Sequence, residues 1–272
     1  MNYKLPKTIF IFSSIACVAL RIFLKLSAVD SFTGFYEGDT LTVIIFNILL
    51  GAAIIAMFAL GLLAKPTAHT MNYRLPSRIL AMLTGISALV FSSTNLFSQI
   101  SEFTNFSASL NLASLVFNLI GVASGVVFLN LGFRMHSDSA GYRANGVLLL
   151  LPLLWQVYVL LTSFMSYTAI RSVSDQLLAT LMLISLVPFL LAHGRILAGA
   201  DTNRGIRHLV AFGLPFSLLA LTTSIGTIAA ALAGKPLEIA LSFTGAVFYL
   251  VTGLYAASCI FSLSDQAPIS AE

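Results

Sequence analysis

The chain has 272 residues, of which 58% are hydrophobic and only 9% are charged, with a formal net charge of +4. A soluble domain typically carries about 25% charged residues, so this composition excludes a water-facing globular surface. Backbone groups in lipid must be satisfied within the chain, and the apolar stretches lack the alternation of barrel strands. We therefore predict an all-α integral membrane protein with no nucleic-acid partner.

Eight apolar segments are long enough to cross a hydrocarbon layer of about 30 Å at roughly 1.5 Å per residue. They lie at 8–27, 40–64, 78–100, 109–133, 146–167, 176–197, 207–233 and 238–262. Their connections are short, so we expect a single transmembrane domain over 1–272. Lys4 and Lys7 before the first segment resemble a cleaved signal, but the apolar run continues to Leu26, which favours retention as the first helix.

Basic residues are concentrated in the segments that would be cytoplasmic if the N-terminus were inside. Ten of the fourteen lie there: Lys4, Lys7, Lys65, Arg74, Arg78, Arg134, Arg143, Arg195, Arg204 and Arg207. The outer loops hold Arg171 and Lys235 and several acids: Asp30, Glu37, Asp39, Glu102, Asp175 and Glu238. The positive-inside rule therefore predicts a multi-pass protein of the plasma membrane with both termini in the cytoplasm.

An internal repeat links the first two pairs of segments. Residues 1–10 read MNYKLPKTIF and residues 71–80 read MNYRLPSRIL, with six of ten positions identical. Basic residues recur before every helix that would begin on the cytoplasmic side. That rule does not explain why Met-Asn-Tyr and Leu-Pro are repeated as well. We predict tandem parallel hairpins that are related by an axis along the membrane normal. Their ranges would be 1–70, 71–140, 141–202 and 203–263.

The first two hairpins should be the most alike. Phe46-Asn47 in the second segment matches Phe117-Asn118 in the fourth. We therefore expect the hairpins at 8–64 and 78–133 to superpose as copies, with Asn47 and Asn118 at equivalent depths.

Arg21 and Lys25 are one turn apart in the first segment, and Arg21 lies about six residues from its outer end. A buried arginine costs several kcal/mol unless it finds water or a partner. One interpretation is a contact for an anion or polar ligand in an outward-facing cavity. The alternative is that both side chains snorkel to headgroups or to Asp30.

The third segment has an unusually polar outer half, in which Asn95, Gln99 and Glu102 recur on one face with Ser92. Since its depth matches that of Arg21, we expect Arg21 to lie inside the bundle within reach of water or of a polar group of this segment, with Gln99 and Glu102 the favoured partners. Polar and small residues also serve helix packing, and that is the interpretation for the Gly121–Gly125 pair in the fourth segment. The candidate substrate-binding residues are Arg21, Lys25, Asn95, Gln99, Glu102 and Asn118.

These patterns favour a permease or small-molecule-binding membrane protein with an outward-facing polar cavity. The expected partners are the lipid bilayer, a small polar or anionic solute, and a membrane protein. The alternatives are a non-catalytic accessory, sensor or assembly subunit, and a membrane enzyme acting on lipid. No acid, base or nucleophile constellation supports the enzyme. The four histidines have no usual ligand spacing, so we expect no metal and no cofactor.

Overall fold

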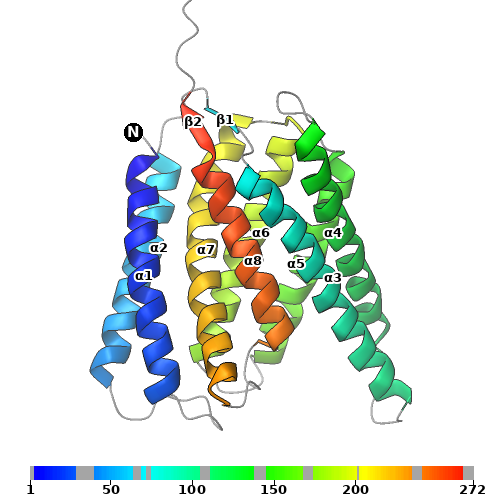
Figure 1. The fold of residues 1–272 in the computed structure, drawn as a ribbon, viewed down its shortest axis with the longest axis horizontal. Coiled ribbons are helices and arrows are strands. Elements are labelled where there is room, and N and C mark those ends of the chain that lie inside the picture. Colours follow the sequence, from blue (N-terminus) through cyan, green and yellow to red (C-terminus); the bar gives the residue numbers. More distant parts are fainter. Residues whose placement is uncertain are drawn as a thin grey trace, which may run out of the picture.

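A computed structural model of the chain describes residues 3–28, 40–63, 69–71, 75–104, 111–137, 145–167, 174–200, 202–234 and 241–265. These residues include eight α-helices that are long and apolar enough to cross a membrane, as predicted (Figure 1). The helices are α1 Lys4–Ser27, α2 Thr40–Leu63, α3 Leu75–Thr104, α4 Leu112–Ser137, α5 Gly146–Tyr167, α6 Ser174–Leu197, α7 Thr202–Leu232 and α8 Phe243–Phe261. No helix end lies more than five residues from its predicted position.

Consecutive helices pack against each other as the pairs α1–α2, α3–α4, α5–α6 and α7–α8. That these pairs are tandem copies, and that both termini lie inside, stay predictions. Residues 72–74 of the second motif copy lie outside the described residues, as do the loop acids Asp30, Glu37 and Asp39.

Two three-residue strands, which the prediction did not include, lie at one end of the bundle. They are β1 His69–Met71, between α2 and α3, and β2 Leu263–Asp265, after α8, and they pair antiparallel. The start of α1 lies at the same end, where Lys7 Nζ donates to the carbonyl of Leu263 at 3.4 Å. The same ammonium is 5.6 Å from the ring centroid of Phe261. The start of the first helix and the end of the last therefore meet (Figure 1).

α7 is the central helix of the bundle. In an apolar stretch of 18 residues within α7, 83% of the residues are buried, against 22% in the corresponding stretch of α2. It packs against α1, α2, α6 and α8. A Cβ added at Gly61 of α2 would lie 2.6 Å from the Cα of Ala211, and one at Gly253 of α8 would lie 2.7 Å from the Cβ of Ala220. Small residues on both sides thus let the neighbouring helices approach α7 closely.

α3 and α4 cross with their backbones almost in contact. A Cβ added at Gly85 would lie 2.8 Å from the carbonyl oxygen of Gly125, and one at Gly125 would lie 2.9 Å from that of Gly85. One turn earlier in α4, a Cβ at Gly121 would lie 2.6 Å from Cε2 of Trp155 and would also meet Ser92. The packing role predicted for Gly121 and Gly125 is confirmed.

Candidate functional site

Arg21 lies inside the helix bundle. Its side chain is 1% exposed, and it shares the buried face of α1 with Ser13 and Cys17, at spacings of four residues. Lys25, one turn later, is 14% exposed. The predicted interior position of Arg21 is confirmed, and the alternative in which Arg21 snorkels to the headgroups is wrong.

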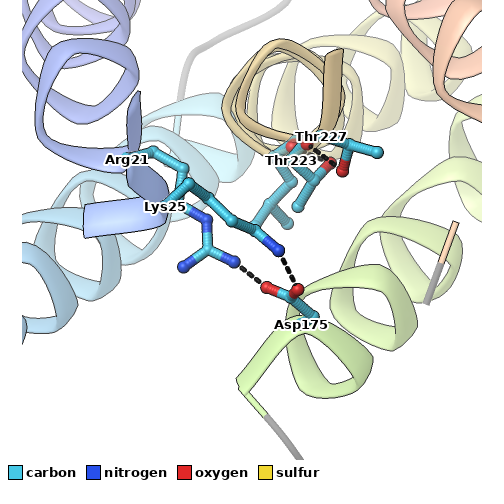
Figure 2. Close-up of polar contacts among 6 residues, drawn as sticks. Arg21, Lys25, Asp175, Thr223 and Thr227 are labelled. Atoms are coloured by element: carbon cyan, nitrogen blue, oxygen red, sulfur yellow. Dashed lines mark hydrogen bonds and ion pairs between the residues drawn. The ribbon is translucent and has the colours of Figure 1, made fainter. Parts of the chain in front are cut away.

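Both cations bind the carboxylate of Asp175, in the first turn of α6. Arg21 donates from Nη2 to Oδ1, and Lys25 donates from Nζ to Oδ2, so each carboxylate oxygen accepts from one cation (Figure 2). Asp175 is itself buried. The positive end of the helix dipole at the start of α6 further favours the charged carboxylate. The three groups, two cations and one carboxylate, sum to a formal charge of +1.

Helices α7 and α2 complete the surroundings of Arg21. Gly226 of α7 makes room for its stem, because an added Cβ there would lie 2.9 Å from Cγ of Arg21. Thr223 and Thr227 stand on the same helix beside the cluster (Figure 2), and each hydroxyl donates to the backbone carbonyl one turn earlier. The ring centroid of Phe46, on α2, lies 5.7 Å from the guanidinium carbon, which is within cation–π range. Both threonine hydroxyl protons are used within α7, so these side chains can accept but not donate a further hydrogen bond.

The predicted partner of Arg21 is wrong. Gln99 instead donates from Nε2 to Ser114 Oγ on α4, and Glu102 is exposed near the end of α3. The physical reason is the packing order. α1 packs mainly on α7 and α2. The neighbour of α1 inside the bundle is therefore α7, where α3 was expected. Figure 1 shows the lower ends of α1 and α3 at opposite edges of the bundle.

The sequence-predicted candidates therefore form separate groups. Arg21 and Lys25, on α1, form the charge cluster with Asp175. Gln99 and Asn118 both bond to Ser114, with Asn118 Nδ2 at 3.4 Å from its hydroxyl oxygen. Asn95 is half-buried on α3, and Glu102 is exposed. The Gln99–Ser114 bond joins α3 to α4, which is the arrangement that the packing interpretation predicts, and the Asn118–Ser114 bond lies within α4.

Asp175 is the residue of this site that the sequence did not indicate. It was counted among the acids of the outer loops, although it directly precedes the sixth apolar segment at 176–197. It was therefore placed at the same side of the membrane as the end of the first segment, two residues beyond Lys25, and this was the available signal. The two residues are 154 positions apart, so no local pattern connects them.

Other buried polar side chains link the helices away from this cluster. Tyr249 of α8 donates its hydroxyl to Oε1 of Gln156 on α5 at 3.2 Å. The Tyr255 hydroxyl lies 2.9 Å from Nε2 of His193 on α6. Within the described ranges, no group of three or more His, Cys, Asp or Glu side chains is arranged to hold a metal ion. We interpret these contacts as links between α8 and its neighbours.

The fold and the buried charges define a multi-pass helical membrane protein with an ionised cluster inside its bundle. No protein-family model matches the chain, and no match is found among curated proteins or solved structures. Function therefore has to be inferred from the chemistry of the site itself.

Proposed function

We propose that the protein is a permease or small-molecule-binding protein of the plasma membrane, and that Arg21 and Lys25 contact an anionic solute. The observation that supports this proposal is the carboxylate of Asp175, which is bound by both cations within the bundle. Ionised residues inside membrane spans are costly and commonly mark a solute or ion pathway.

The Asp175 carboxylate occupies the place that a solute would take. A carboxylate or phosphate group carries the same charge and offers similar acceptor oxygens, so it competes with Asp175 for the Arg21 guanidinium and the Lys25 ammonium. Exchange of one anion for the other keeps both cations paired throughout.

Displacement of Asp175 would also act on the helices. This carboxylate joins the end of α1 to the start of α6, so its release weakens the contact between them. With the N-terminus inside, as predicted, these two helix ends face outward, and the solute enters from outside.

The test is uptake and binding of labelled acetate, succinate and inorganic phosphate by the purified protein in liposomes. Arg21→Gln should lower binding of the transported anion at least roughly tenfold, because a hydrogen bond to a charged group is worth about 1.5–3 kcal/mol. The matched control is Arg134→Gln, which changes an exposed arginine on α4 and should leave binding unchanged.

A second variant separates a binding role from a structural one. Asp175→Asn removes the competing charge, so the folded variant should bind the anion more tightly than the wild type does. The proposal fails if folded Arg21→Gln protein binds and moves each anion as the wild type does. It also fails if the pure protein handles no anion and co-purifies at fixed stoichiometry with an ATPase or large subunit, which would support the accessory alternative.

A further inference from the structure

The polar side chain of Asn47 lies on the side of α2 that faces away from the bundle, within the membrane-spanning part. Asn47 is exposed, seven residues after the start of α2 at Thr40, or roughly 10 Å along the helix. Its carboxamide makes no hydrogen bond to any other described residue. Asparagine is too short to reach the headgroups from this depth, and an amide without a hydrogen-bond partner in hydrocarbon is unfavourable by several kcal/mol.

The matching asparagine of α4 shows what Asn47 lacks. Asn118 is buried and donates to Ser114, one turn earlier in its own helix. The residue one turn before Asn47 is Val43, which has no polar side-chain atom. A side-chain partner for Asn47 therefore has to come from outside the described residues of its own chain.

The face of α2 around Asn47 is suited to contact with another helix. Ile44, Ile48 and Ile55 are 50%, 66% and 69% exposed, and with Asn47 and Gly51 they recur at helical spacing along one stripe. A Cβ added at Gly51 would meet nothing within 4 Å. This combination of an open glycine and a polar residue one turn away is typical of contacts between membrane helices.

We propose that this stripe of α2 is a dimer interface with a second copy of the chain, in which the two Asn47 carboxamides bond to each other. All copies insert with the same orientation, so a symmetric pair has its two-fold axis along the membrane normal. Each residue near that axis then meets its own counterpart at the same depth. A carboxamide both donates and accepts, so it is complementary to itself.

The interface also adjoins the charge cluster. Phe46, the neighbour of Asn47 in the sequence, is fully buried and packs on Arg21, while Asn47 faces outward. The α1–α2 pair forms one edge of the bundle in Figure 1, so a second copy can pack on α2 without displacing other helices.

The first test is the dimerisation constant of the full chain in lipid bilayers, measured by single-molecule photobleaching over a series of protein-to-lipid ratios. Asn47→Val should weaken dimerisation roughly three- to thirty-fold, as for other hydrogen bonds between membrane helices. The control is Asn130→Val, which changes an exposed asparagine of α4, four residues before the exposed Arg134. Asn130 is not on α2, so this variant should leave the dimerisation constant unchanged. Both variants replace an exposed amide by an apolar side chain, so folding should be preserved.

The second test is cysteine cross-linking, in which the buried native residues Cys17 and Cys259 serve as the background. Ile55→Cys lies on the stripe and should cross-link to its counterpart. Ile45→Cys is also exposed but lies off the stripe, so it should cross-link at the background level. A monomeric wild type at every ratio, unchanged dimerisation of Asn47→Val, or equal cross-linking of the two cysteine variants would overturn the proposal. So would a different protein bound to α2 at fixed stoichiometry.

Discussion

Replacing Asp175 with asparagine should destabilise the protein more than replacing Arg21 with leucine. Asparagine keeps the shape of aspartate and removes only the charge that both cations bind. Arg21→Leu removes one of two like charges and leaves the pair of Lys25 and Asp175 in place. The ordering of the two variants therefore tests the cluster as the structure arranges it.

The magnitudes follow from the charges. Two unit charges 4 Å apart attract by about 4 kcal/mol at an effective dielectric constant of about 20. Arg21 and Lys25, one turn apart, repel by about 3 kcal/mol at roughly 6 Å. Asp175→Asn loses both attractions, about 8 kcal/mol together, but no longer has to desolvate a buried carboxylate, which costs several kcal/mol. We therefore expect a net loss of about 3–5 kcal/mol, as when one partner of a buried pair is removed. Arg21→Leu loses one attraction together with the repulsion, and we expect about 1 kcal/mol.

The assay is unfolding in mixed micelles, followed by the fluorescence of Trp155. This residue is the only tryptophan of the 272 residues and is 1% exposed, so its emission reports the loss of the folded bundle. Glu102→Gln is the control, because it changes an exposed acid on α3 and should cost less than about 1 kcal/mol. Equal losses for Asp175→Asn and Arg21→Leu would refute the shared carboxylate. A loss for Glu102→Gln as large as that for Asp175→Asn would restore the partner predicted from the sequence.

Three further predictions test other parts of the chain. Tyr255→Phe should lower the free energy of unfolding by about 1 kcal/mol through loss of its bond to His193, and an unchanged value would exclude that bond. Gly121→Val should lower it by roughly 1–3 kcal/mol because the side chain meets Trp155, and an equally stable variant would contradict the close packing there. Reporter fusions should show external activity in the loop at 29–39 and cytoplasmic activity at the C-terminus, and the reverse result would overturn the predicted orientation.

The membrane spans could be predicted from the sequence because their causes are local. A spanning helix satisfies its own backbone groups, and its length must match the hydrocarbon layer. α5 accordingly has the predicted bounds, 146–167. α3 extends beyond the predicted 78–100 to Thr104, because polar residues outside the apolar stretch continue the helix.

The position of each helix within the bundle could not be predicted from its hydropathy. α2 has the highest mean hydropathy of the eight spans yet lies at the edge, with 22% of its apolar 18-residue stretch buried. α7 is less apolar and lies at the centre. Lipid is as apolar as the side chains that face it, so hydropathy drives insertion but does not select which helices meet. Contacts such as Gly61 with Ala211 make that selection.

Three features of the site could be predicted from the sequence: Arg21 lies within the first span, it needs a partner, and Lys25 is one turn away. The identity of the partner, Asp175, depends on how the helices pack. The pairing depends on α1 and α6 both packing against α7, at contacts such as that of Gly226 with Arg21. Those contacts are spread over most of the chain and join residues far apart in sequence. Each contributes only a small part of the packing energy. No single segment therefore carried the signal for the ion pair.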